Sequence, residues 1–156
     1  MVSHDRRVLP FTCLLVLFAS FAARAEPLLP PVKRASELAK KGEILGLEQK
    51  VDDASAAFEE ATALYQKLAD QTPSDGAGRQ SLAACYEKFG DMLVGNNRLD
   101  RGLATYQKSL EIRQSLATQD SENAERLHDV IRSLARMGRV SILQHRSASR
   151  IRRASA

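Results

Sequence analysis

The sequence predicts an all-α fold made of antiparallel helix pairs, about two and a half units with a period of 48 residues. Apolar side chains recur every three or four residues through most of the chain after residue 35, which is typical of amphipathic helices. Glycines recur at the same interval as the units, at Gly42, Gly90 and Gly138. Strand signals are weak, because aromatic residues make up only 5% of the chain and no segment sustains apolar–polar alternation.

Residues 1–25 are predicted to be a secretory signal peptide. A short charged start ends at Arg7, an apolar run covers positions 8–21, and "AARA" ends at Ala25. The apolar run is shorter than the roughly 18–20 residues needed to span a bilayer. We therefore expect cleavage near Ala25 and a periplasmic or secreted protein, with an uncleaved membrane anchor as the alternative.

Residues 26–34 are predicted to be a linker, and the repeat domain is predicted over residues 35–143. In the central unit, Leu82, Cys85, Phe89 and Leu93 form one helical stripe. "GNN" at 95–97 is predicted to break the helix, since Gly and Asn tolerate the left-handed conformation. A second helix is expected from about residue 99 to 117, with its counterpart at 51–68 in the first unit. "QTPSDG" and "QDSEN" are predicted to separate the units.

The glycines are predicted to mark the places where two helices cross closely. A glycine inside a helix costs about 1 kcal/mol relative to alanine, so packing should compensate for it. We expect Gly90 to face Gly102 and Ser109, and Gly42 to face Ala54 and Ala61. Larger side chains such as Phe58, Tyr86, Phe89 and Tyr106 should interlock beside these contacts.

This pattern resembles the tetratricopeptide repeat family, whose first helix carries large residues around a glycine and whose second helix carries a small–aromatic–small series. The resemblance covers most of the chain after the signal peptide and implies an α-solenoid that binds proteins or peptides. The third unit departs from it, because Ser147 and Arg150 stand where its second helix should carry an apolar and a small residue. The residues that carry the signature are Gly42, Ala54, Phe58, Tyr86, Gly90, Gly102, Tyr106 and Gly138.

The resemblance also implies that side chains of the first helices line a concave face. Carried onto this chain, that face includes Glu43, Glu87, Asp91, Arg132 and Arg139. Members of the family that clamp a peptide carboxylate use basic side chains and asparagine, whereas Glu87 and Asp91 would repel one. The alternative is that these residues simply form solvated helix faces.

Charge is divided unevenly along the chain. Residues 26–129 carry 13 basic and 18 acidic side chains, whereas residues 130–156 carry seven arginines and no acid. The tail "QHRSASRIRRASA" at 144–156 is predicted to be frayed or disordered. Arginine-rich segments can contact anionic lipid, so peripheral membrane contact through this tail is one alternative function. Nucleic acid binding is not expected, because export and the lack of aromatic residues in the tail argue against it.

No catalytic or metal-binding arrangement is predicted. After the signal peptide the chain has two histidines, His128 and His145, and neither has metal-ligand spacing. Cys85 is then the only cysteine, which excludes an intramolecular disulfide, and it is expected to be a buried hydrophobe. We therefore expect neither enzymatic activity nor a cofactor.

The predicted function is that of an exported scaffold or adaptor that binds a protein or peptide partner. A further alternative is a structural subunit that assembles with copies of itself, because two and a half units leave one end of the stack open. The third helix would then pair through its exposed apolar side, predicted to comprise Leu134, Met137, Val140, Ile142 and Leu143.

Overall fold

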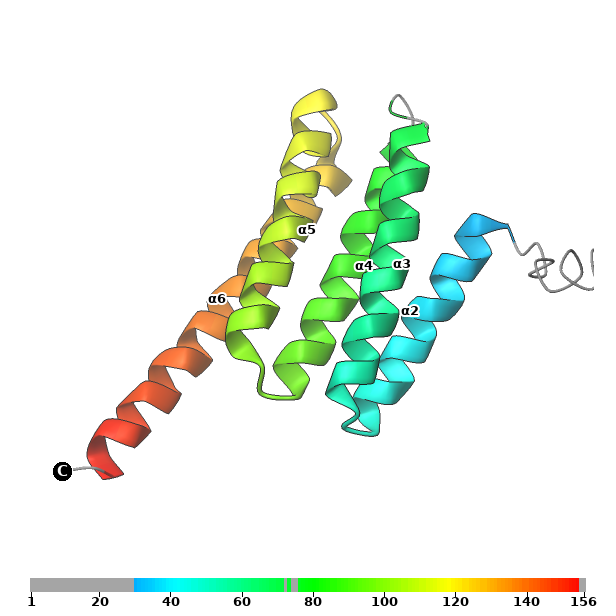
Figure 1. Ribbon diagram of the computed structural model, residues 1–156. Coiled ribbons are helices and arrows are strands. Elements are labelled where there is room, and N and C mark those ends of the chain that lie inside the picture. The colour runs from blue at the N-terminus through cyan, green and yellow to red at the C-terminus, as the bar shows by residue number, and fades with distance from the viewer. Residues whose placement is uncertain (1–29, 72, 74–75, 155–156) are drawn as a thin grey trace, which may run out of the picture.

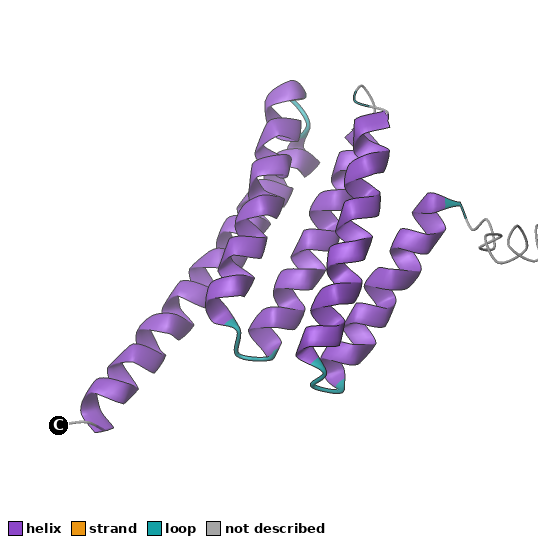
Figure 2. Ribbon diagram, in the orientation of Figure 1, coloured by secondary structure: helices purple, strands orange, loops and turns teal. Residues whose placement is uncertain are grey.

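The computed structural model describes residues 30–71, 73 and 76–154, and this part of the chain folds into five helices without strands (Figure 2). The all-α prediction is therefore confirmed. The predicted signal peptide and residues 26–29 of the predicted linker lie outside the described residues, whereas residues 31–34, which were also expected to be linker, belong to the first described helix. The helices are α2 (Pro31–Leu47), α3 (Val51–Gln71), α4 (Gly76–Gly95), α5 (Leu99–Gln119) and α6 (Ala124–Ala154).

The helices run up and down, each antiparallel to the one before it (Figure 1). The element α2 packs against α3 and α4, α4 also packs against α3 and α5, and α5 packs against α6. Short connections enforce this order, because a loop of a few residues leaves the next helix only the neighbouring position. The α2–α3 and α4–α5 connections both lie at the lower end of the molecule in Figure 1.

The break between α4 and α5 occurs where the sequence predicted it. The helix α4 ends at Gly95, and Asn97 adopts a left-handed conformation with φ of 59°. The side-chain amide of Asn96 donates hydrogen bonds to the carbonyl oxygens of Met92 (2.8 Å) and Gly46 (3.2 Å), which caps the ends of α4 and α2 together. In the α2–α3 connection, Gln49 adopts the left-handed conformation, with φ of 61°. Glutamine is not one of the residues that indicate a turn in a sequence.

The core is centred on the α2–α3–α4 contact. The rings of Phe58 and Phe89 stack with centroids 5.1 Å apart and planes 9° apart, which joins α3 to α4. Cys85 is buried beside them, as expected. The buried members of this cluster are Ala39, Ala54, Phe58, Ala61, Cys85, Phe89, Met92 and Leu93.

The glycines are explained by aromatic rings rather than by small residues alone. A Cβ built on Gly90 would lie 2.6 Å from Cε1 of Tyr106, and one on Gly42 would lie 2.6 Å from Cδ2 of Phe58. The helices do approach closely near Gly102, whose added Cβ would lie 3.4 Å from the Gly90 carbonyl oxygen. We expected the rings to interlock beside the glycines, but the rings of Phe58 and Tyr106 each lie directly on a glycine.

The third glycine differs from the other two. A Cβ on Gly138 would meet nothing within 4 Å. The expectation that Gly138 is a helix contact is therefore wrong for the described residues. Its place on α6 is open because no second helix follows α6 in this part of the chain.

The helix α6 continues for 31 residues to Ala154 and does not give way at residue 144 to the expected frayed or disordered tail. No Gly or Pro follows Gly138 within α6, so nothing in the local sequence stops it. The expected exposed side of this helix also needs correction. Val140 is buried against the rest of the molecule, whereas Leu134, Ile142 and Leu143 are exposed.

Candidate functional site

Ion pairs join α4 to α2 on one side and to α6 on the other. We call the side of the molecule that carries these pairs the α2/α4/α6 face; its paired residues are Glu43, Lys88, Glu87, Asp91 and Arg136. Lys88 of α4 pairs with Glu43 of α2 at 2.5 Å. On the other side of α4, Glu87 accepts an ion pair from Nε of Arg136 in α6 at 2.8 Å, and Arg136 also pairs with Asp91. This face carries most of the residues that the sequence assigned to a concave surface.

The centre of the α4–α5–α6 contact is a buried ion pair between Glu87 and Arg113, which are 8% and 6% exposed. Nη2 of Arg113 donates to Glu87 Oε2 at 2.6 Å. Its Nη1 donates to the hydroxyl of Ser133 at 3.0 Å and to the carbonyl oxygen of Asp129 at 3.2 Å. Burying two charges is tolerated only when further hydrogen bonds satisfy their remaining groups, and both terminal nitrogens of Arg113 have such partners.

Two further guanidinium groups close this network from α6. Arg132 pairs with Asp129 at 2.5 Å and lies 3.9 Å from Glu87. Although burial lowers the pKa of Arg136, the attraction of Asp91 and Glu87 outweighs it, so its pKa lies above the ordinary value. The network matches three carboxylates with three guanidinium groups, so it is close to neutral; its members are Glu87, Asp91, Asp129, Arg113, Arg132 and Arg136.

Tyr106 connects this network to the helix contact at Gly90. Its hydroxyl donates a hydrogen bond to Asp91 Oδ1 at 2.5 Å. Burial raises the pKa of the Tyr106 phenol, and the hydrogen bond to Asp91 raises it further. The phenol is therefore held in its neutral, donating form.

The five expected concave-face residues are placed as follows. Arg132 and Arg136 both approach Glu87, and Arg136 also pairs with Asp91, whereas Glu43 lies apart with Lys88. Arg139 is exposed beside a cavity of about 220 Å³ that Asp91 and Tyr106 also line. The ion pairs engage four of the five within the molecule; whether they also contact a partner stays a prediction.

Sequence reasoning named Arg132 but missed the other two guanidinium groups of the network, those of Arg113 and Arg136. Arg113 lies seven residues after Tyr106, and Glu87 lies three residues before Gly90, so each charge shares the helix face that makes the aromatic contact. Two opposite charges on facing buried stripes must pair, because an unpaired buried charge is too costly. That rule could have predicted Arg113. Arg136 depends on the orientation of α6 and carried no such signal.

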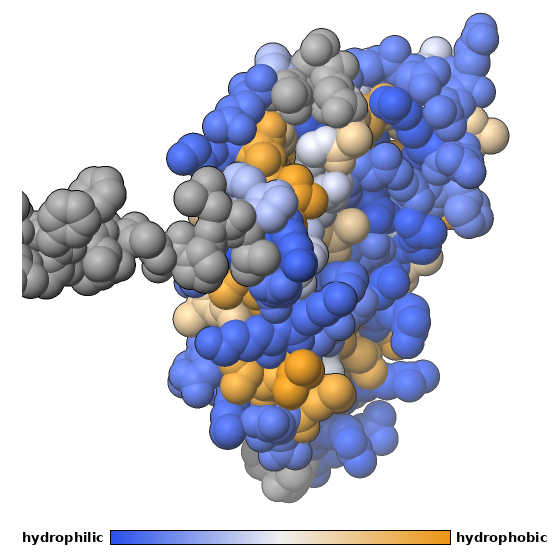
Figure 3. Space-filling model, turned by 90° about the vertical axis from the view of Figure 1, so that its right-hand side faces the viewer, coloured by the Kyte–Doolittle hydropathy of each residue, from blue (hydrophilic) through white to orange (hydrophobic). Residues whose placement is uncertain are grey.

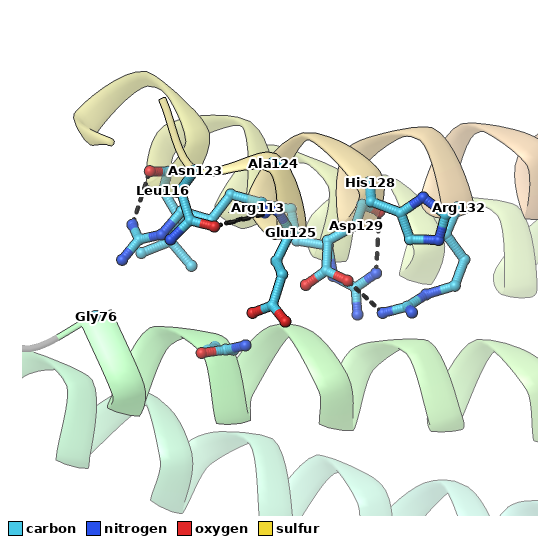
Figure 4. Close-up of a pocket in the computed structure, with 11 residues that line it drawn as sticks. Gly76, Arg113, Leu116, Asn123, Ala124, Glu125, His128, Asp129 and Arg132 are labelled. Carbon is cyan, nitrogen blue, oxygen red and sulfur yellow. Dashed lines mark hydrogen bonds and ion pairs between the residues drawn. The ribbon is translucent and has the colours of Figure 1, made fainter. Parts of the chain in front are cut away.

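A cavity of about 670 Å³ opens between α4 and α6, with α5 as its floor (Figure 4). Glu125, His128 and Arg132 of α6 stand around it (Figure 4). Gln80 of α4 also lines it. Both terminal nitrogens of Arg113 in its floor donate hydrogen bonds to protein acceptors. The cavity therefore offers polar side chains at its rim and no free buried cation for an anionic ligand.

A second cavity of about 510 Å³ lies between α2 and α4. Leu47 and Met92 supply apolar surface, and the Glu43–Lys88 pair forms part of its lining. Leu47 is 86% exposed. Figure 3 looks onto the end of the molecule where α2 lies and shows separate apolar patches divided by hydrophilic bands.

Within the described residues, no three His, Cys, Asp or Glu side chains are grouped so that they could hold a metal ion. None of the helices that the structure describes combines the length and the apolar character needed to cross a membrane. Among known proteins, no family model matches this chain, and no curated protein or solved structure is significantly similar to it.

Proposed function

We propose that this chain is an exported, non-enzymatic scaffold of tetratricopeptide-like helix pairs that binds a protein partner along its α2/α4/α6 face. The proposal rests on one observation: the same contact between a glycine and an aromatic ring occurs in two places. Gly42 meets Phe58 between α2 and α3, and Gly90 meets Tyr106 between α4 and α5. Each ring follows its glycine by the same number of positions, and the second pair stands one full repeat interval after the first.

This recurrence supports a unit that is used twice and begun a third time with α6. Stacked helix pairs of this kind present their first helices on one side, which here are α2, α4 and α6. Two cavities with mixed polar and apolar linings lie along that side. Five of the charged residues on it, Glu43, Lys88, Glu87, Asp91 and Arg136, are paired with one another, so the face suits a mixed polypeptide surface better than a small charged ligand.

Site-specific photo-crosslinking in the native cell envelope tests this proposal. A photo-reactive amino acid would replace Leu47 beside the α2–α4 cavity or Gln80 beside the α4–α6 cavity. Matched controls would carry it at Lys67 of α3 and Gln107 of α5, which are also exposed. We expect one discrete crosslinked protein from the first two positions and none from the controls. Equal crosslinking from all four positions, or none from any, would contradict the proposal.

Export is tested separately by cell fractionation and N-terminal sequencing of the protein at its natural expression level. We expect the mature chain to begin at Glu26 and to fractionate outside the cytoplasm. A cytoplasmic chain that retains residues 1–25 would refute the export half of the proposal and leave partner binding to be judged by the crosslinks.

A further inference from the structure

The helix α6 has an exposed apolar face that is centred on an open glycine. Its large members are 48–62% exposed, and they lie three or four residues apart along one side of the helix. The opposite side of α6 packs on the molecule through Val140 and Ser133, both of which are buried. We name this exposed side the Gly138 face; it comprises Leu127, Ile131, Leu134, Gly138 and Ile142.

The two earlier helix pairs indicate what such a face accepts. At Gly42 and Gly90, an aromatic ring from an antiparallel helix occupies the space that a Cβ would take. Gly138 stands at the same interval, but the residue at the matching place is Ala154, which has no ring and belongs to α6 itself. A straight helix cannot fold back onto its own side, so α6 cannot fill this face.

We propose that the Gly138 face binds an amphipathic helix of another protein, antiparallel to α6, with an aromatic side chain seated on Gly138. This inference rests on the proposed repeat organisation and names the class of partner that would complete it. In both existing pairs the aromatic residue has a small residue four positions before it and another three positions after it. These residues are Ala54 and Ala61 around Phe58, and Gly102 and Ser109 around Tyr106.

This chain holds no spare segment with that pattern. The two aromatic residues that have it, Phe58 and Tyr106, are already buried in their own pairs. None of the other six has small residues at both places, including the three in the apolar run before residue 25. They are Phe11, Phe18, Phe21, Tyr65, Tyr86 and Phe89. The occupant that we propose is therefore a helix of a different protein and not one of these aromatic segments.

Charge gives the occupant a second property. Arg132, Arg139, Arg146 and Arg150 follow one another at intervals of seven, seven and four residues, which places them along one edge of the Gly138 face. Among the described residues, no carboxylate pairs with Arg139, Arg146 or Arg150. An acidic edge on the incoming helix would complement them.

The same arginines disfavour a second copy of this chain. Two antiparallel α6 helices related by a two-fold axis at Gly138 would lie with their arginine edges on the same side. Like charges would then face each other, and two glycines would meet without a ring between them. A partner helix with acidic residues and a ring avoids both problems.

The probe for this proposal is a constrained helical peptide with the sequence of α3, residues 51–71. It carries the small–aromatic–small pattern at Ala54, Phe58 and Ala61, with five acidic side chains and one lysine. Binding of the labelled peptide to the full-length protein would be followed by fluorescence anisotropy. A peptide with Phe58→Ala is the control for the ring.

Gly138→Leu is the decisive protein variant. Its side chain enters open space and favours the helix, so the variant should fold, which circular dichroism would verify. It fills the place of the incoming ring, and we expect peptide binding to weaken about tenfold or more. Ala63→Leu, which adds a leucine on the exposed side of α3, should leave binding unchanged. Reversing Arg139 and Arg146 to glutamate should weaken binding, whereas Lys67→Glu should not.

Absence of peptide binding to the wild-type protein, or equal binding by Gly138→Leu, would overturn the proposal. So would a wild-type dimer that Gly138→Leu converts to a monomer, because the occupant would then be a second copy. The photo-crosslinks at Leu47 and Gln80 report on the α2/α4/α6 face alone. Failure of one assay is therefore distinguishable from failure of the other.

Discussion

The ring of Tyr106 lies directly against the Cα of Gly90, so that a methyl group added there would sit 2.6 Å from ring carbon Cε1. The same ring carries a hydroxyl that donates to Asp91, the next residue of α4. One side chain of α5 thus makes a close apolar contact with α4 and also anchors the polar network that reaches α6. The two roles can be separated by substitution.

The glycine contacts predict that alanine substitutions at the three glycines change the free energy of unfolding in opposite directions. Gly90→Ala and Gly42→Ala should lower the free energy of unfolding by about 1–3 kcal/mol, because the new methyl group would overpack a buried ring. Gly138→Ala should instead raise it by up to about 1 kcal/mol, since its methyl group enters open space and alanine favours the helix. Urea unfolding of the three variants measures this. A shift of all three in the same direction would contradict the assignment.

The two roles of Tyr106 predict two different losses. Tyr106→Phe keeps the ring on Gly90 but removes the hydrogen bond to Asp91, which should cost about 1 kcal/mol of stability. Tyr106→Ala removes both and leaves a cavity, which should cost about 3–5 kcal/mol. Thermal unfolding of both variants checks this ratio. Equal losses would mean that the hydroxyl, and not the ring, holds α5 on α4.

The buried Glu87–Arg113 pair predicts strong dependence on both partners. Arg113→Met should destabilise the protein by about 3 kcal/mol, because it removes the partner that holds Glu87 in a bidentate contact. The double variant Glu87→Leu with Arg113→Met should lose less than the sum of the single losses, and a double-mutant cycle measures the difference.

The exposed pair of Arg34 and Glu60 is the matched control for this cycle. Their side chains are 44% and 49% exposed, so Arg34→Met should cost less than about 1 kcal/mol. A larger loss at Arg34 than at Arg113 would show that burial does not determine the strength of these ion pairs.

Stability should fall in alkaline solution. Burial raises the pKa of Cys85 to about 12, and burial also raises the pKa of Tyr65, Tyr86 and Tyr106. In the unfolded chain these groups lose their protons near their ordinary values, at about pH 8.5 for cysteine and 10 for tyrosine. A folded pKa above the unfolded one gives stability that is complete below the unfolded value and is lost as pH rises towards the folded value.

Urea unfolding between pH 7 and 11 measures this decline, which should begin between pH 8 and 9. Cys85→Ala should make the early part of it shallower, because it removes the group with the lowest ordinary pKa among the four. Stability that remains constant up to pH 11 would contradict the burial of these side chains.

The helices and their pairing were predictable from local sequence. Periodic apolar residues and the break at Asn97 determine where α4 ends and α5 begins, and the spacing of Gly90 and Tyr106 reports their close packing. The end of α6 was not predictable from the repeat, because residues 139–154 contain no helix-breaking residue and local propensity prevails over the expected pattern.

The polar network was only half predictable for a similar reason. The burial of Glu87 depends on Arg113 lying across from it, which the pairing of α4 and α5 determines. The approach of Arg136 depends on how α6 is turned on α5, a tertiary property without a local signal. Charged residues expected on an open face are therefore partly inside the molecule.

The extension of α6 to Ala154 affects how charge is distributed over the molecule. Residues 130–156 carry seven positive charges and no negative one, while residues 26–129 have a net charge of −5. Gln144 donates a hydrogen bond to Asp100 near the lower end of α5, and the part of α6 that follows, with four of the seven arginines, extends beyond that end (Figure 1), so the centres of positive and negative charge are separated in space. The molecule therefore has a permanent electric dipole, and the field of this dipole would orient a charged molecule that approaches it. Its rate of encounter should consequently slow as ionic strength rises, even where the final complex is held by apolar contacts.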